Sequence, residues 1–273
     1  MDGHSSQNCL DRFLGLRLGN VSFQNYIGEG GYGEVWKVRW KGKVAAGKQL
    51  RGFLFDTNER ALERFLVEYN ILRRLSHPNI IKMFGLEIVE GHPPIMIMEL
   101  MHQDLDTYVH DSRTEPKVQL KDAIGILLGV AKGLNYLHTL SLPLRPVIHR
   151  DLSSKNILLD KMKFAKITDL GQAKISSDRF LEEATPKPGF WPYLAPETYS
   201  LHDYDNARAS WKATYGSEVD IFSFGVVALE VVIGRRPRPE ERINPRGMCY
   251  KNHLDHLASN ENLFASPSKR KFV

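Results

Sequence analysis

The sequence predicts an α+β fold in which the strands come first and the helices follow. Between residues 21 and 101, apolar and polar residues alternate in short runs, a pattern typical of β-strands. From Leu105 onwards, apolar residues recur every three or four positions, which indicates helices. We therefore expect a small β-rich unit over 21–101 and a larger, mainly helical unit over 102–236. A lead-in over 1–20 and a polar, basic tail over 237–273 would flank them.

The composition is that of a soluble globular protein. Among the 273 residues, 42% are hydrophobic and 25% are charged. The net charge of +5 favours solubility first and attraction to phosphate-bearing ligands second. Lysine and arginine are interleaved with acidic residues, which argues against a nucleic-acid partner. The only two cysteines, Cys9 and Cys249, cannot form a disulfide framework or a zinc cluster, so a reducing compartment is expected.

Two segments bear on targeting. The first eight residues are polar and lack the apolar core of a signal peptide. The most apolar later stretch, Ile221 to Ile233, is too short to span a bilayer and contains Glu230. We expect a cytoplasmic protein without a membrane span.

A glycine string opens the β-rich unit. Gly28, Gly30 and Gly33 form G-x-G-x-x-G, with Ile27 before them and Val35 after. A dinucleotide-binding fold would need a helix next, whereas the residues from Trp36 to Trp40 alternate as a strand does. The glycines therefore lie in a hairpin, where backbone N–H groups can approach phosphate oxygens.

The next strand and helix carry a candidate ion pair. Over Val44 to Leu50, the strand period places Ala46 and Lys48 on one face. There a small residue leaves room for a flat base, and the ammonium can reach phosphates. In the predicted helix 58–75, Glu68 lies on an apolar face, which is unfavourable without a cation. Lys48 is the expected partner; the alternative is that both residues are simply exposed.

Two more strands are expected near Ile80–Glu87 and Ile95–Glu99, after which the chain leaves the β-rich unit. Met98 would limit access behind a bound base, or it is ordinary core filler. The backbone at Glu99 and Met101 would hydrogen-bond the base.

Two long helices are predicted in the second unit. The first runs from about Val118 to Leu140 and has a buried face marked by Ile124, Leu127, Ala131 and Leu134. The second begins near Ser217 and ends at Gly234. Asp220, near its start, would either cap this helix or hold the preceding 149–156 loop from beneath.

The octet from His149 to Asn156 fits H-R-D-L-x-x-x-N at every fixed position. In this motif Asp151 would accept the proton of an attacking hydroxyl, and Asn156 would hold a metal ion beside the phosphates. The apolar run Ile157 to Leu159 is a short buried strand that anchors the loop. The alternative is a surface loop that holds a histidine, an arginine and an aspartate by chance.

Two further motifs follow. Asp169-Leu170-Gly171 matches D-F-G except at Leu170, and Asp169 would be a second ligand of Mg²⁺. Ala195-Pro196-Glu197 matches A-P-E. Between them lie hydroxyl groups that phosphorylation would convert into partners for Arg150, and nothing selects one of them: Ser176, Ser177 and Thr185.

In this order the motifs resemble a eukaryotic protein kinase catalytic domain over about residues 21–236, most similar to the tyrosine kinase-like group of Ser/Thr kinases. The resemblance implies a bilobal protein kinase-like fold with a small β-rich N-lobe and a larger, mainly helical C-lobe. It also implies ATP in the cleft, Mg²⁺, and transfer of the γ-phosphate to a protein hydroxyl. The implied catalytic residues are Lys48, Glu68, Arg150, Asp151, Asn156 and Asp169, of which Asn156 and Asp169 bind metal. The implied ATP pocket consists of Ile27, Gly28, Gly30, Gly33, Val35, Ala46, Lys48, Met98, Glu99, Met101 and Leu158.

The markers of the acceptor hydroxyl conflict. Ser153 and Phe190 stand where Ser/Thr kinases usually have lysine and threonine, groups that steady the catalytic aspartate. Tyrosine kinases often have arginine where Lys155 stands, and they favour tryptophan at Tyr193. Ser/Thr acceptors are preferred, and tyrosine stays open.

The end of the chain also departs from the family. After Pro237 we find no counterpart of the last kinase helices or of the arginine that would pair with Glu197, so an incomplete C-lobe is expected. Two hypotheses follow. The chain is an active kinase with ATP, protein substrates and signalling partners, because every ATP- and metal-handling residue is present. Alternatively, it is a catalytically silent, pseudokinase-like scaffold that binds protein partners.

Overall fold

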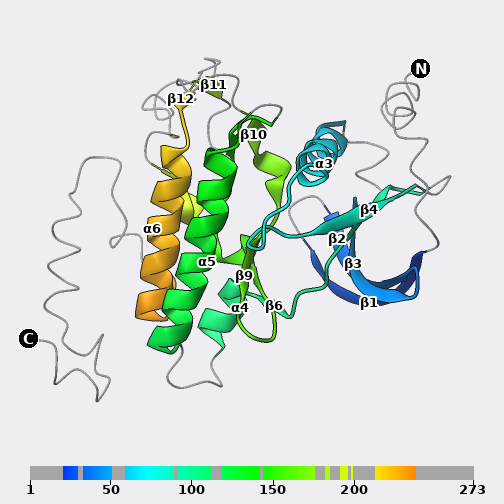
Figure 1. The fold of residues 1–273 in the computed structure, drawn as a ribbon, viewed down its shortest axis with the longest axis horizontal. Helices are drawn as coiled ribbons and strands as arrows, with labels where there is room; N and C mark the ends of the chain where they lie inside the picture. Colours follow the sequence, from blue (N-terminus) through cyan, green and yellow to red (C-terminus); the bar gives the residue numbers. More distant parts are fainter. Residues whose placement is uncertain are drawn as a thin grey trace, which may run out of the picture.

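The structure is a computed structural model. It describes residues 21–29, 33–50, 59–88, 92–111, 118–141, 144–175, 182–184, 191–195, 198 and 213–237. The two-lobe α+β architecture expected from the sequence is present (Figure 1), with a strand-rich lobe at one side and long helices at the other. The predicted tail over 237–273 lies outside the described residues except for Pro237.

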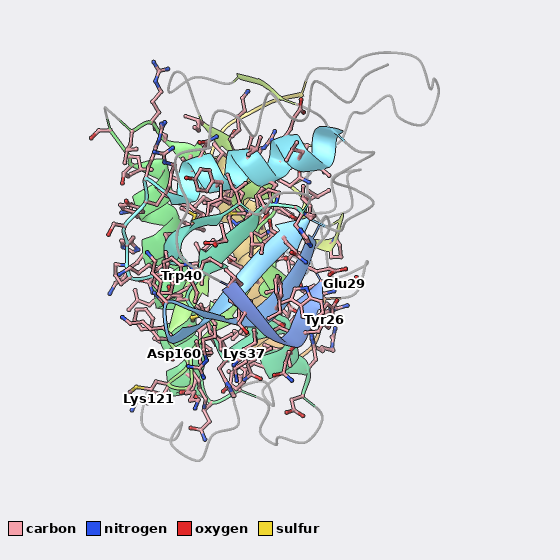
Figure 2. The ribbon with its side chains drawn as sticks, turned by 90° about the vertical axis from the view of Figure 1, so that its right-hand side faces the viewer. Tyr26, Glu29, Lys37, Trp40, Lys121 and Asp160 are labelled. Atoms are coloured by element: carbon pink, nitrogen blue, oxygen red, sulfur yellow. The ribbon has the colours of Figure 1, made fainter. Side chains whose placement is uncertain are left out.

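The N-lobe is built on a five-stranded antiparallel sheet in the order β1-β2-β3-β5-β4. Its strands are β1 (Val21–Glu29), β2 (Gly33–Trp40), β3 (Lys43–Leu50), β4 (Met83–Glu87) and β5 (Ile95–Met98). One helix, α3 (Glu59–Leu72), lies across this sheet (Figure 2). Phe65, Tyr69 and Leu72 of α3 are buried in the main core, as their spacing predicts.

The C-lobe contains three described α-helices: α4 (Leu105–His110), α5 (Leu120–His138) and α6 (Glu218–Ile233). The α5 and α6 helices lie side by side in Figure 1. Among the described residues, no helix is both long and apolar enough to cross a bilayer.

Short strands and 3₁₀ turns position the loops of this lobe. One small sheet has the order β6-β8-β9, and two strand pairs, β7 with β10 and β11 with β12, complete the set. Their bounds are β6 Gln103–Asp104, β7 Val147–Ile148, β8 Ile157–Leu159, β9 Ala165–Ile167, β10 Lys174–Ile175, β11 Glu182–Ala184 and β12 Ala213–Tyr215. The 3₁₀ turns are η1 (Ser154–Asn156), η2 (Leu170–Gln172) and η3 (Trp191–Tyr193).

The predicted buried face of α5 was wrong in part. Ile124 is 57% exposed, Leu127 and Ala131 are only partly buried, and Leu134 is buried as predicted. The buried residues of α5 are Ala123, Ile126, Gly129, Val130, Gly133, Leu134 and Leu137. The reason is backbone proximity: a Cβ at Gly133 would lie 2.9 Å from both the Asn79 carbonyl oxygen and the Ile167 side chain. Gly129 and Gly133 of α5 face β9, and in this orientation Ile124 points to solvent.

Replacing Gly133 by alanine is therefore expected to destabilise the protein by about 1–2 kcal/mol, because overpacking of about 1–3 kcal/mol exceeds the gain in helix propensity. A Cβ at Gly125 of the same helix meets nothing within 4 Å. Gly125→Ala should consequently stabilise by about 0.5–1 kcal/mol. Urea denaturation of both variants measures the difference, and equal effects would contradict this packing.

Candidate active site

Three charged side chains from both lobes meet at one point. The Lys48 Nζ on β3 lies 2.7 Å from Glu68 Oε2 on α3 and 3.1 Å from Asp169 Oδ1 at the start of η2. Glu68 is buried, as its place on the apolar face of α3 predicts. Gly33 and Gly171 line the same small cavity as these three residues. The predicted ion pair is therefore present, and it carries a second carboxylate.

The ammonium of Lys48 stabilises both carboxylates, and they stabilise its charge in return. Burial lowers the pKa of Lys48, but the carboxylates of Asp169 and Glu68 outweigh it and raise the pKa above its ordinary value. Burial raises the pKa of Glu68 despite the neighbouring ammonium. The pKa of Asp169 is lowered, because the attraction of Lys48 exceeds the effect of burial. The result is a fixed cation whose position suits phosphate oxygens.

The register of the sheet places the predicted base-binding residues opposite one another on neighbouring strands. Val35 pairs with Gly28 on one side and with Lys48 on the other. Ala46 lies directly opposite Met98. Ile27 lies at an irregularity of β1, between the paired residues Tyr26 and Gly28, and is half exposed.

The hinge between the lobes offers fewer free backbone groups than expected. The Glu99 N–H donates to the Lys82 carbonyl oxygen at 3.0 Å, so the Glu99 carbonyl is the group that can meet a base. Met98 is buried in the core and lies opposite Ala46, which confirms its role as core filler, and its role behind a bound base stays a prediction. Leu158 on β8 and Met101 are partly buried. Gly30 lies outside the described residues.

Hydrogen bonds fix the tautomer of the catalytic-loop histidine. His149 is fully buried, and its Nδ1 accepts the Asp151 N–H at 3.2 Å. Its Nε2 must therefore carry the proton, which it donates to the Thr168 carbonyl oxygen at 2.9 Å. The imidazole thus ties the loop of Asp151 to the residue before Asp169.

Asp220 of α6 holds this loop from beneath. Its carboxylate accepts the His149 N–H at 2.8 Å, the Arg150 N–H at 2.8 Å and the His138 Nε2–H at 2.7 Å. Arg150 has a left-handed backbone with φ of 64°, a conformation that is unfavourable for a side chain of this size. Of the two predicted roles for Asp220, the described structure shows the second.

Asn156 and Asp169 offer oxygen ligands that suit a hard divalent cation. Asn156 Nδ2 donates to the Asp151 carbonyl oxygen at 2.7 Å, which leaves the Asn156 amide oxygen as its ligand atom. The Thr168 N–H donates to the Asn156 carbonyl oxygen at 3.0 Å, which places Asn156 beside Asp169. An amide oxygen and a carboxylate are oxygen ligands of the kind that Mg²⁺ takes from proteins.

Arg150 directs its side chain to the segment after Asp169. Its Nε donates to the Gln172 carbonyl oxygen at 2.6 Å. The hydroxyls predicted to accept a regulatory phosphate, and the Glu197 carboxylate, lie outside the described residues.

Sequence reasoning missed a buried polar cluster below the catalytic loop. The Ser154 hydroxyl lies 2.9 Å from the Tyr193 hydroxyl, 3.1 Å from Glu230 Oε1 and 3.3 Å from Asp106 Oδ1. The Tyr193 hydroxyl donates to Glu230 Oε2 at 2.6 Å, and Arg236 Nη2 contacts both oxygens of Asp106. Burial raises the pKa of both Tyr193 and Glu230. The signal was present: a carboxylate inside the apolar stretch 221–233 requires a buried partner.

A bilobal fold with a lysine held by two carboxylates, beside a loop carrying an aspartate and an asparagine, defines a phosphotransfer domain. The chain belongs to the protein tyrosine and serine/threonine kinase family, whose family model matches residues 21–263. This match runs past residue 236, where the recognisable motifs end.

Two relatives from Arabidopsis thaliana illustrate the similarity. A G-type lectin S-receptor-like serine/threonine-protein kinase is 34% identical over 220 residues, which cover 80% of this chain and 25% of that protein. A probable LRR receptor-like serine/threonine-protein kinase is also 34% identical over 220 residues, 79% of this chain and 20% of that protein. The chain therefore spans about a quarter or less of the length of these relatives.

The Lys48→Met variant is expected to lose stability, because it leaves the buried Glu68 without its cation. Removing one partner of a buried pair costs about 3–5 kcal/mol. Adding Glu68→Gln removes the stranded charge, so the double variant should recover part of that loss. Chemical denaturation of the two variants checks this order, and a double variant less stable than Lys48→Met would contradict it.

Proposed function

We propose that this domain is an ATP-dependent protein kinase that transfers the γ-phosphate of ATP to serine or threonine hydroxyls of protein substrates. The observation that carries the proposal is the trio of Lys48, Glu68 and Asp169 facing a loop that holds Asp151 and Asn156. The named relatives are serine/threonine-protein kinases, which supports these acceptors over tyrosine.

Phosphoryl transfer passes through a loose, metaphosphate-like transition state, so catalysis consists mainly of positioning and charge neutralisation. Lys48, held by Glu68, would bind phosphate oxygens. Asp151 would orient the substrate hydroxyl and accept its proton at the carboxylate. Asn156 and Asp169 would hold Mg²⁺, which supplies neutralising charge at the phosphates when it is bound.

We also propose which group of kinases the protein belongs to and where in the cell it works. The motifs favour the tyrosine kinase-like group, and the lack of a membrane-spanning helix among the described residues is compatible with work in the cytoplasm. Its partners would be ATP, a protein substrate and other signalling proteins.

Transfer of radiolabelled phosphate from Mg-ATP by the purified chain tests this function. Acid hydrolysis of the labelled product then identifies the phosphoamino acid. We expect phosphoserine or phosphothreonine, and no label from Lys48→Met. Phosphotyrosine alone would overturn the acceptor class.

A lack of label from folded, ATP-binding protein would overturn the enzymatic proposal and favour a scaffold. Ser153 supports the scaffold alternative, because it occupies the position where Ser/Thr kinases usually have lysine and is itself buried.

A further inference from the structure

The tip of the β2–β3 hairpin and the start of β4 together carry a group of aromatic and cationic side chains. We call this group the hairpin patch: Trp40, Lys41, Lys43, Lys82 and Phe84. The rings of Trp40 and Phe84 are stacked, with centroids 6.4 Å apart and an interplanar angle of 4°. In Figure 2 Trp40 lies at one side of the sheet that faces the viewer, while Tyr26 and Glu29 lie at the other side.

The aromatic part of the hairpin patch is partly open to solvent. Phe84 is 41% exposed, and Trp40 is partly buried against the core cluster that contains Val38 and Ile97. The ammonium of Lys41 lies 4.6 Å from the centre of the Trp40 ring, and that of Lys82 lies 6.0 Å from the centre of the Phe84 ring. Each aromatic ring thus has a cation beside it, at the boundary between apolar surface and water.

The turn of this hairpin is tightly defined. Lys41 and Gly42 both have positive φ angles, 47° and 77°, which makes a tight two-residue turn. The Arg39 guanidinium donates to the Gly42 carbonyl oxygen at 3.2 Å and braces that turn.

Positive charge at the tip is not neutralised locally. Within the part of the chain that the structure describes, no carboxylate pairs with Lys41, Lys43 or Lys82. Glu99 is an acidic group beside Lys82, but its carboxylate accepts the Lys82 N–H and pairs with Lys166 at 2.8 Å.

We propose that the hairpin patch binds the surface of an anionic phospholipid bilayer. Tryptophan favours the interface between acyl chains and water, and each nearby lysine adds attraction to anionic headgroups. The tight hairpin turn, with the exposed Phe84 ring beside it, can enter such an interface. A nucleic acid would stack its bases on open ring faces, and Trp40 is already stacked on Phe84 and covered by Lys41.

This placement keeps the active site away from the membrane. Lys48 lies five residues along β3 from Lys43 (48 − 43), roughly 16 Å at ~3.3 Å per residue. Membrane binding and phosphate transfer are therefore separable, so the inference stands or falls independently of the proposed activity.

Co-sedimentation of the full chain with lipid vesicles tests the proposal. We expect binding to vesicles of phosphatidylcholine and phosphatidylserine in equal parts, weakened by salt, and little binding to phosphatidylcholine alone. The Lys41→Glu/Lys43→Glu variant should bind more weakly by at least a factor on the order of thirty, the effect of losing two attractive charges. Its circular dichroism spectrum and its denaturation midpoint should match those of the parent chain, which shows that the variant folds.

A matched control is Arg73→Glu/Arg74→Glu, which makes the same change in net charge at two exposed residues after α3. This control should retain binding. The proposal is overturned by an equal loss in both variants, by undiminished binding of the hairpin variant, or by no binding of the parent chain. If the parent chain binds a polyglutamate peptide but no vesicles, the hairpin patch is assigned to an acidic protein instead.

Discussion

The Asp151→Asn variant is expected to lose phosphate transfer while it keeps its fold and its affinity for ATP. A positioned general base contributes on the order of 10²- to 10⁴-fold to the rate, and an amide cannot accept the proton. The position of residue 151 is held by main-chain groups: its N–H bonds His149 and its carbonyl oxygen accepts from Asn156. Asparagine preserves both contacts, and it leaves the trio around Lys48 intact.

Initial rates of phosphate transfer and titration with a fluorescent ATP analogue measure the two effects separately. Asp122→Asn is the matched control and should keep its activity. It alters a partly exposed ion pair between Asp122 of α5 and Lys163. A variant at Asp151 with more than a tenth of the parent rate would show that this carboxylate is not the base.

The Asp220→Asn variant is expected to lose about as much stability as Lys48→Met. The buried carboxylate accepts three hydrogen bonds, and an amide offers one oxygen and turns an N–H₂ group toward the remaining donors. Breaking a buried charged hydrogen-bond network costs about 3–5 kcal/mol. The left-handed backbone of Arg150 would relax at the same time, so phosphate transfer should fall even where the protein stays folded.

Denaturant titration gives the stability, and rates measured well below the unfolding midpoint give the second effect. The Asp122→Asn substitution is again the reference, because its ion pair with Lys163 is partly open to solvent, and ion pairs at the surface contribute only about 0–1 kcal/mol. If the two variants unfold at the same denaturant concentration, Asp220 does not hold the loop.

The order of motifs predicted the bilobal α+β fold, and side-chain periodicity predicted the meeting of Lys48 and Glu68. Both follow from local rules, since strand and helix periods determine which residues share a face. A carboxylate on an apolar helix face requires a cation, and the preceding strand offered one. Asp169 was predicted from its motif as a metal ligand, but its contact with Lys48 was not, because that contact depends on how the two lobes close.

The remaining features depend on tertiary contacts that local patterns do not contain. The rotation of α5 is determined by close backbone approach at Gly129 and Gly133, whereas its pattern alone favoured a face through Ile124. The sequence left two roles for Asp220, capping its helix or holding the 149–156 loop. Only the position of α6 under the loop decides between them. Glu230 was noticed only as a charge that argued against a membrane span, and its partners Ser154 and Tyr193 are distant in sequence.

The two carboxylates that pair with Lys48 are synthesised at different times. Glu68 is 20 residues away along the chain, and Asp169 is 121 residues away. During synthesis the N-lobe can therefore form the first ion pair well before Asp169 has been translated. Loop closure over the longer separation is entropically less favourable and comes late in folding. The phosphate-binding centre is thus assembled in two stages, and nucleotide affinity reports whether the second stage is complete.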